Sequence, residues 1–161
     1  MQPPTAPEAI GDAEVLQIAT RVLAGIALRG LALSARPMPL RQFQLLSVLE
    51  EMGRTSTEQA ARALRLSLPS VTRLVDRLVA SGYLARGTHP YNRSVVTLEL
   101  TSSGRDLVAR VMHWRHQELA RILHKLGSPE RRAAIEAIRT FVHAASGTGY
   151  GIDHLISGRP D

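Results

Sequence analysis

The helix on which the rest of this 161-residue chain depends is encoded by residues 67–82, which read SLPSVTRLVDRLVASG. Ser67 can accept a hydrogen bond as the N-cap, and Gly82 can adopt the left-handed conformation that ends a helix. Between them, apolar residues recur at the spacing of one helix face. This stripe consists of Val71, Leu74, Val75, Leu78 and Val79. The pattern therefore predicts an amphipathic helix.

The opposite face of this helix is small, polar and basic. Its residues are Pro69, Ser70, Thr72, Arg73 and Arg77. Short hydroxyl side chains followed by arginines suit a helix whose N-terminal end enters the DNA major groove. A solvated face in an ordinary helical bundle has the same pattern, so the helix alone leaves both interpretations open.

A predicted helix over residues 40–52 precedes this region. Pro39 suits its first position, and Gly53 follows its end. Apolar residues again recur on one face. We expect the buried stripe of this helix to consist of Phe43, Leu46, Leu49 and Met52.

A shorter helix lies between these two. Residues 56–59 read STEQ, a capping-box pattern that opens a helix running through Leu64. Residues 65–67 then leave a connection of about three residues before the amphipathic helix. Two short helices at this separation fit a helix-turn-helix motif.

The periodicity changes after Gly82. Residues 83–86 predict a strand, residues 87–93 a loop with basic character, and residues 94–100 a second strand. In the second strand, alternation assigns to one face Val96, Leu98 and Leu100, and to the other Val95, Thr97 and Glu99. A hairpin directly after a recognition helix is a wing, so we predict a winged helix-turn-helix.

Long helices flank this unit. We expect them over residues 12–35, 101–126 and 128–145, the last two capped by their first residues, a threonine and a serine. Gly25 and Gly30 interrupt the first helix, either to admit another helix closely or to produce a kink. Three long helices with apolar faces, beside a small unit, expose more apolar surface than one monomer can cover. This excess fits a homodimer.

The charge of the chain is concentrated in its middle. The net charge is +6, and residues 54–93 contain seven arginines against two acidic residues, a net of +5. A basic run is usually a solvated face, but its position on the predicted helix-turn-helix and wing favours a polyanionic partner such as double-stranded DNA. The chain has no cysteine, which excludes disulfides and thiolate metal sites.

The chain reads as one domain of mainly α class with a small β-hairpin. We expect a flexible leader over residues 1–11, a single domain over 12–146 and a flexible tail over 147–161. Within the domain, two dimerisation segments flank the winged-helix unit; these are 12–36 and 101–146 around 38–100. No signal peptide and no apolar run of bilayer length is evident, so we expect a cytoplasmic protein without membrane contact.

The order of elements and two motif strings resemble the MarR (multiple antibiotic resistance regulator) family of bacterial transcription factors. The resemblance covers residues 38–104, and its strongest parts are SVTRLVDRL at 70–78, GYL at 82–84 and LTSSG at 100–104. It implies a homodimer whose lobes enter successive major grooves of a pseudo-palindromic operator. It also implies a regulator, typically a repressor, released by a phenolic or anionic small molecule.

From this we predict which residues contact DNA. Ser70, Thr72 and Arg73 read bases, with Pro69 and Arg77 beside them on the same helix. Phosphate and wing contacts are assigned to Arg54, Thr57, Arg62, Arg65, Arg86 and Arg93.

The wing departs from the family's usual Asp-x-Arg pattern, because Asn92 and Ser94 stand on either side of Arg93. This departure motivates an alternative function: a winged-helix module that binds proteins and has lost DNA binding. Loss of the bracing acid would weaken or redirect the wing's contact with the minor groove.

The resemblance also implies a binding site for an effector. Trp114 and Arg115 can line a crevice between the winged-helix unit and the dimerisation helices, although Trp114 can equally fill a dimer core. Other candidate walls of this crevice are Leu28, Phe43, Leu46 and Val111.

Other chemistry finds little support. His113 and His116 lie one helical turn apart and could join His143 and Glu118 around a metal, but such pairs are more often surface residues. We predict no metal site and no cofactor. The chain also lacks a nucleophile elbow, a phosphate-binding loop or a paired-carboxylate motif, and no enzyme activity or catalytic residue is expected.

Overall fold

The computed structural model describes residues 11–89 and 92–145, with the backbone alone for residues 89 and 92–95. The predicted leader lies outside the described residues apart from Gly11, and the predicted tail lies wholly outside them. None of the described helices is long and apolar enough to cross a membrane.

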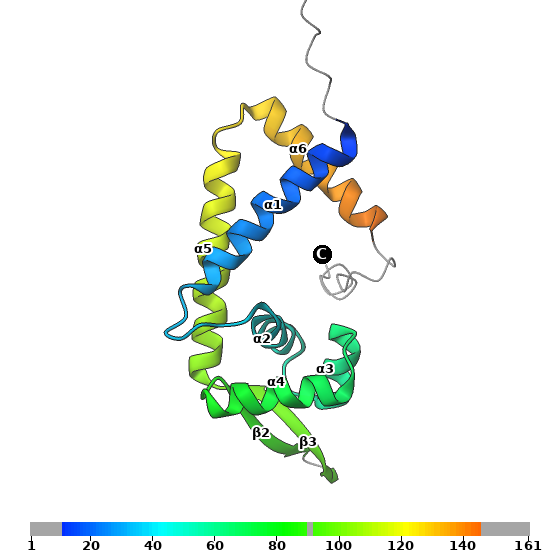
Figure 1. The fold of residues 1–161 in the computed structure, drawn as a ribbon, viewed down its shortest axis with the longest axis vertical. Helices are drawn as coiled ribbons and strands as arrows, with labels where there is room; N and C mark the ends of the chain where they lie inside the picture. Colours follow the sequence, from blue (N-terminus) through cyan, green and yellow to red (C-terminus); the bar gives the residue numbers. More distant parts are fainter. Residues whose placement is uncertain (1–10, 90–91, 146–161) are drawn as a thin grey trace, which may run out of the picture.

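Six helices and three strands follow one another along the described residues. They are α1 (Asp12–Leu31), α2 (Leu40–Met52), β1 (Thr55–Ser56), α3 (Thr57–Leu64), α4 (Leu68–Ala80), β2 (Leu84–His89), β3 (Asn92–Leu100), α5 (Ser102–Leu123) and α6 (Ser128–Ala144). We call residues 38–100 the lobe and helices α1, α5 and α6 the arm. Figure 1 shows the lobe at one end of the molecule and α6 at the other, with α5 running between them.

The core lies in the lobe and extends onto the first turns of α5. The stripe of α4 enters it as predicted, with Val71, Val75 and Leu78 buried, and Leu74 and Val79 partly buried. From α2 the core receives Phe43, Leu45, Leu46 and Leu49. Met52 was expected here, but 42% of it is exposed because it is the last residue of α2, one turn beyond the covered part of the stripe.

Local signals around the helix-turn-helix are confirmed in part. Ser56 and Gln59 form the predicted capping box, in which the backbone N–H of Gln59 donates to Ser56 Oγ at 3.2 Å. Gly82 adopts a positive φ of 77° after α4. Ser67 occupies the N-cap, but no cap hydrogen bond forms; its hydroxyl lies 2.8 Å from Ser70 Oγ. Pro69 at the second position has no N–H to donate, which removes one of the two usual partners.

The sheet is larger than the sequence predicted. Its strand order is β1-β3-β2, with all pairs antiparallel, and the two-residue β1 was not expected. The hairpin strands also run further than 83–86 and 94–100, because pairing continues to His89 and Asn92. The predicted seven-residue loop is therefore wrong, since backbone pairing between strands extends the hairpin almost to its tip.

The burial of β3 also differs from the predicted alternation. Leu98 and Leu100 are buried, but Val96 is 46% exposed and Thr97 only 3% exposed. Thr97 pairs with Ser56 on one side and Gly87 on the other, so β3 is the central strand at that point. Val96 lies beyond the end of β1, which pairs only with Thr97 and Leu98, so this strand does not cover it.

Helix α5 begins at a cap that also contacts a residue between α4 and β2. Thr101 Oγ1 accepts from the Gly104 amide at 3.1 Å and donates to the Gly82 carbonyl at 2.7 Å, so the predicted cap is confirmed. Gly104 is required here, because an added Cβ would lie 2.2 Å from the Tyr83 carbonyl oxygen. Ser128 is the first residue of α6 rather than its cap, and Gly127 is the N-cap. Pro129 favours this start, since proline suits the first turn of a helix.

Helix α1 packs on α5 and ends at Leu31, earlier than predicted. At Gly30 an added Cβ would lie 3.3 Å from side-chain atoms of Val111, Trp114 and Arg115. Close helix approach therefore explains Gly30, whereas nothing lies within 4 Å of such an atom at Gly25. Pro39 is the N-cap of α2 instead of its first residue.

Candidate nucleic-acid interface

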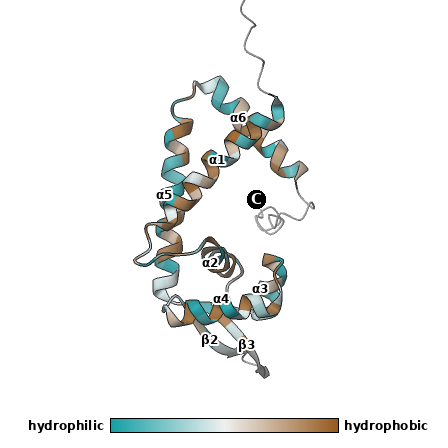
Figure 2. Ribbon diagram, in the orientation of Figure 1, coloured by the Kyte–Doolittle hydropathy of each residue, from teal (hydrophilic) through white to brown (hydrophobic). Residues whose placement is uncertain are grey.

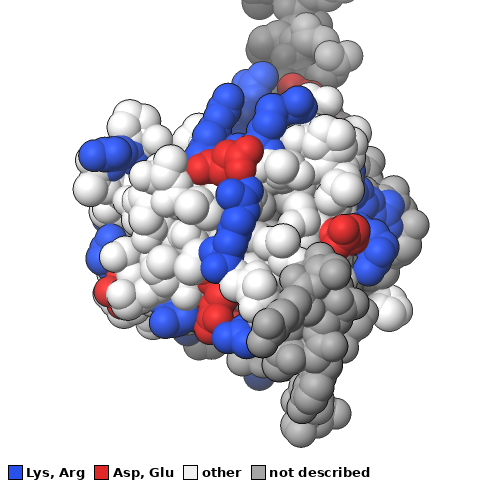
Figure 3. Space-filling view, turned by 90° about the horizontal axis from the view of Figure 1, so that it is seen from below, with Lys and Arg blue, Asp and Glu red and all other residues white. Residues whose placement is uncertain are grey.

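The exposed face of α4 lies at the end of the molecule that Figure 3 views, where basic side chains lie beside acidic ones and among uncharged ones. Of the predicted base-reading residues, Thr72 and Arg73 are exposed and Ser70 is half-buried; Pro69 and Arg77, predicted beside them, are exposed too. The periodicity that buries Val71, Val75 and Leu78 necessarily turns these residues outward. The predicted recognition surface is thus assembled on one element.

Hydrogen bonds within α4 fix several of these side chains. Ser70 Oγ lies 2.8 Å from Ser67 Oγ and accepts from Arg73 Nη2 at 3.4 Å. Thr72 Oγ1 donates to the Leu68 carbonyl at 2.9 Å. The Thr72 hydroxyl hydrogen is therefore committed to the helix backbone and not to an outside acceptor.

Two arginines of α4 have no acidic partner among the described residues. Within the part of the chain that the structure describes, neither Arg73 nor Arg77 has a carboxylate at ion-pair distance. Both side chains are exposed, and a guanidinium is only weakly hydrated, so each can exchange its water for phosphate or guanine. This is the electrostatic arrangement expected of a surface that meets a polyanion.

Two predicted wing and phosphate arginines are instead held by acids. Arg86 of β2 pairs with Asp76 of α4, and Arg54 pairs with Glu99 of β3 at 2.9 Å. All four side chains are between 42% and 56% exposed, so each pair contributes little to stability. Their geometric effect is clearer: Asp76 and Arg86 tie the wing to the recognition helix.

The remaining predicted phosphate contacts lie around α3. Arg62 and Arg65 are exposed, and Thr57 is half-buried at the first position of the helix. Arg65 ends α3 in the left-handed conformation, with φ 50°, and so directs the chain into the turn before α4. The backbone of Arg93 belongs to β3, but its side chain lies outside the described part of the structure.

The predicted effector residues differ in burial. Phe43, Leu46 and Val111 are fully buried in the core, and Leu28 is exposed. Trp114 and Arg115 are half-buried where α5 meets α1.

Arg115 connects three helices. Its Nη2 donates to the Ala27 carbonyl of α1 at 2.9 Å, and its guanidinium carbon lies 4.7 Å from the centre of the Phe43 ring of α2. Burial lowers the pKa of Arg115 from its ordinary value. Its Nε has no hydrogen-bond partner among the described residues.

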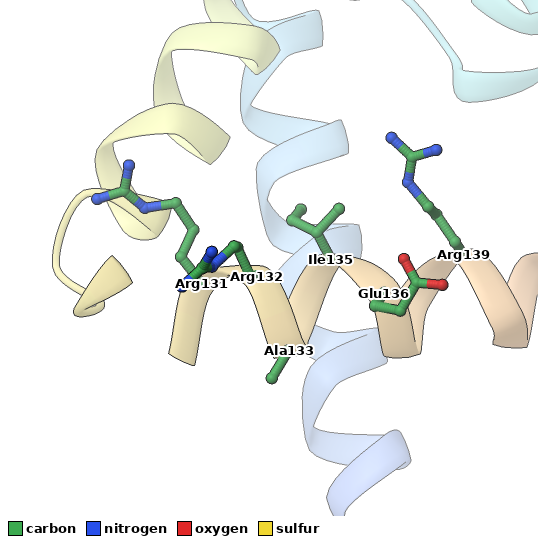
Figure 4. Close-up of a pocket in the computed structure, with 6 residues that line it drawn as sticks. All are labelled: Arg131, Arg132, Ala133, Ile135, Glu136 and Arg139. Carbon is green, nitrogen blue, oxygen red and sulfur yellow. The ribbon is translucent and has the colours of Figure 1, made fainter. Parts of the chain in front are cut away.

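Two open hollows occur elsewhere on the described surface. One of about 560 Å³ is lined by the α1–α2 connection and by Leu28 and Leu31. The other, of about 570 Å³, lies on α6 and is shown in Figure 4, where Ile135 and Arg139 extend to one side of the helix and Ala133 to the other. Leu28 is the one predicted effector residue that lines either hollow.

The histidines considered for metal binding lie on α5 and α6. His113 Nε2 lies 2.8 Å from Gln117 Nε2 on the same helix. No group of three or more His, Cys, Asp or Glu side chains among the described residues is arranged to hold a metal ion.

Sequence reasoning missed three residues of this surface. Asp76 and Glu99 hold the arginines that were assigned to DNA, and exposed Leu68 stands at the start of α4. Asp76 shares the exposed face with Arg73 and Arg77, and that spacing indicates an acid close to the predicted DNA-binding arginines. The Arg54–Glu99 pair spans 45 positions, and no local pattern indicates it.

A three-helix lobe with a helix-turn-helix and a β-hairpin wing is a winged helix, and comparisons with known proteins agree. A model of the MarR family matches residues 37–93. RV1404 of Mycobacterium tuberculosis, a solved structure, superposes with a TM-score of 0.80 at 30% identity over 89% of this chain and 99% of that one. Apo MarR of E. coli has a TM-score of 0.65 at 20% identity over 84% and 98%, which supports the fold alone.

Curated relatives give the same result. YfiV, an uncharacterised HTH-type transcriptional regulator of Bacillus subtilis, is 28% identical over 101 residues, 63% of each chain. Mb0904 of Mycobacterium bovis, also an uncharacterised HTH-type regulator, is 30% identical over 59% of this chain. The aligned regions span 63% and 66% of the lengths of these two relatives. The chain belongs to the MarR family, whose members are transcriptional regulators and not enzymes.

Proposed function

We propose that this protein is a homodimeric, sequence-specific DNA-binding repressor that acts in the bacterial cytoplasm. The observation that carries the proposal is the exposed face of α4, where Arg73 and Arg77 lack carboxylate partners within the described chain. Beside them stand exposed Pro69 and Thr72 and half-buried Ser70. Arg73 reads a base edge together with Ser70, and Arg77 contacts the backbone or a neighbouring base.

The arm supports the dimer. Large apolar side chains of α1 and α6 are about half exposed in the single chain, and the brown segments of both helices are visible in Figure 2. They include Val15, Ile18, Val22, Leu23, Ile138, Phe141 and Val142. Large apolar side chains exposed along two helices are typical of an interface. A second copy covers it and sets two lobes apart, as a pseudo-palindromic operator requires.

The contacts around α4 follow from charge and position. Arg62 and Arg65, with Thr57 at the start of α3, meet phosphates beside the groove. Arg86 and Arg54 remain near the DNA but share their charge with Asp76 and Glu99, so each contributes less than an unpaired arginine. Arg93 is proposed as the wing contact.

Release by an anionic or phenolic effector is the finer part of the proposal. Its support is Arg115, a half-buried cation without a carboxylate partner in the described chain, at the junction of arm and lobe. Trp114 beside it offers an aromatic wall. A ligand bound there would compete with the Ala27 and Phe43 contacts and change how the lobe is held.

Selection of bound sequences from random double-stranded DNA tests the function. We expect one enriched pseudo-palindrome, with affinity that falls steeply as salt rises. Arg73→Ala should cost about 1–3 kcal/mol and relax specificity at one base pair per half-site. Arg132→Ala, on exposed α6 at the far end of the molecule, is the matched control and should change nothing.

The opposite results would favour a different function. The absence of any DNA binding at low salt would support the protein-interaction module that Asn92 and Ser94 suggest. Equal losses for Arg73→Ala and Arg132→Ala would remove α4 from the interface. Small phenolic and carboxylic acids added to the complex then test release, with Arg115→Met as the variant expected to lose it.

A further inference from the structure

The first turn of α4 exposes apolar groups on a face that is otherwise polar. Leu68 is 44% exposed, and Pro69 beside it is exposed as well. A single exposed leucine is ordinary on a protein surface. Its meaning here depends on the neighbours that share its face.

Thr72 makes that face more apolar than its sequence indicates. Its hydroxyl donates to the Leu68 carbonyl at 2.9 Å, so its hydrogen points back to the helix backbone. The γ-methyl is the other branch of this exposed side chain. Residues four apart are neighbours on a helix surface, which places the Thr72 methyl beside Leu68. We call Leu68, Pro69 and Thr72 the apolar strip.

Polar groups adjoin the apolar strip and define its surroundings. The Ser70 hydroxyl contacts Ser67 and Arg73 and forms the polar border of the strip on this turn. Arg73 and Arg77, which have no carboxylate partner among the described residues, lie further along the same helix. An apolar strip next to such arginines fits a polyanion that also offers apolar groups, and fits a protein core poorly.

In the major groove of DNA, the apolar group on the base edges is the C5-methyl of thymine, and 5-methylcytosine carries the same methyl. We propose that the apolar strip recognises the C5-methyl group of a pyrimidine in each operator half-site, with Leu68 as the main specificity-determining residue. This inference rests on the proposed DNA-binding function and specifies which base feature the start of α4 reads.

Substitution of deoxyuridine for thymidine tests the inference, because it removes the methyl alone. The full-length protein is titrated against its selected operator, in which each thymidine of one half-site is replaced in turn. We expect one position to lose about fourfold in affinity, the effect of losing one buried methyl group. At that position, a 5-methylcytosine–guanine pair should bind more tightly than a cytosine–guanine pair, which separates the methyl from the rest of thymine.

Protein variants then locate the contact. In Leu68→Ala the penalty for deoxyuridine should disappear, whereas Leu68→Met, which keeps an apolar side chain, should retain it. Thr72→Ser removes the γ-methyl and keeps the hydroxyl, and should reduce the penalty. Thr72→Val keeps the γ-methyl and removes the hydroxyl, and should not reduce it. Thermal unfolding of each variant confirms that α4 is intact, as the exposure of Leu68 leads us to expect.

Each outcome is informative. Selective DNA binding without a methyl-sensitive position overturns this inference and leaves the proposed function standing. A methyl-sensitive position whose penalty is unchanged in Leu68→Ala also overturns it. Failure to select any sequence from random DNA overturns both the inference and the proposed function.

Discussion

The lobe and the arm are built from helices with similar apolar periodicity, yet they treat their apolar faces differently. In the lobe, Phe43, Leu46 and Leu98 are at most 1% exposed. In the arm, Ile138 and Phe141 are more than half exposed, and α6 has no buried residue in the single chain. The lobe surrounds its stripes with three helices and a sheet, whereas α6 lacks such cover.

This difference shows which part of the molecule buries its apolar faces within a single chain. Burial of apolar area stabilises the lobe without a partner, at about 25 cal/mol per Å². The exposed apolar faces of α1 and α6 obtain the same stabilisation only if another surface covers them. We therefore expect mutations of buried residues to act on folding, and mutations of these exposed apolar residues to act on assembly.

The largest effect should come from Phe141→Asp. Phe141 is exposed in the single chain, so the change should barely alter its folding. In the proposed dimer it would bury an unpaired carboxylate at a cost of at least about 3 kcal/mol, which weakens association more than a hundredfold. Analytical ultracentrifugation should show monomers, and Phe141→Leu should remain dimeric. A persistent dimer of Phe141→Asp would place the interface elsewhere.

Leu98→Ala should be the largest change within the lobe. Leu98 is fully buried in β3, and truncating such a leucine costs about 2–5 kcal/mol in the free energy of unfolding. Val96→Ala in the same strand is the matched control, since exposed Val96 should cost less than about 0.5 kcal/mol. Urea unfolding measures both. Similar losses at the two positions would contradict the burial pattern of β3.

Two glycine-to-alanine changes should have opposite signs. Gly104→Ala places a Cβ against the Tyr83 carbonyl and should destabilise the chain by about 1–3 kcal/mol. Gly25→Ala meets nothing within 4 Å in the interior of α1 and should stabilise it by about 1 kcal/mol. Thermal unfolding distinguishes them. If Gly25→Ala also destabilised the protein, that face of α1 would be in contact with the second copy.

Arg115→Met probes the connection between the two regions. It keeps an apolar stem but removes the hydrogen bond to Ala27 and the contact of the cation with Phe43. We expect a loss of about 1–2 kcal/mol in unfolding free energy. Amide exchange should accelerate at the end of α1 and remain slow in the core of α2. Uniform acceleration would indicate that Arg115 does not act locally.

The smallest effect concerns pH. The pKa of Glu58 is lowered by hydrogen bonds from its own backbone amide and from Ser56, with Arg62 adding to the shift and desolvation opposing it. A lowered folded-state pKa contributes stability that is present above the ordinary pKa of 4.5 and is lost as pH falls through the folded-state pKa. Glu58→Gln should therefore flatten a slight acid-side decline in unfolding free energy. An unchanged slope would show that Glu58 makes no such contribution.

The features that could be read from the sequence are those whose partners are close along the chain. The capping box joins Ser56 to Gln59, the stripe of α4 repeats every three or four residues, and Gly82 ends that helix with its own backbone. Each depends on hydrogen bonds or periodicity within about one turn. The helix-turn-helix, the wing and the basic surface follow from such local signals.

Other features depended on segments that are distant in sequence. Strand β1 exists because β3 pairs with it, and this pairing buries Thr97 while Val96 lies past its end. Asp76 and Glu99 reduce the availability of Arg86 and Arg54 because folding brings those charges together. The start of α4 likewise exposes Leu68 because none of the described elements covers it. Burial and pairing are properties of the whole packing arrangement, so residues that look equivalent in the sequence acquired different roles.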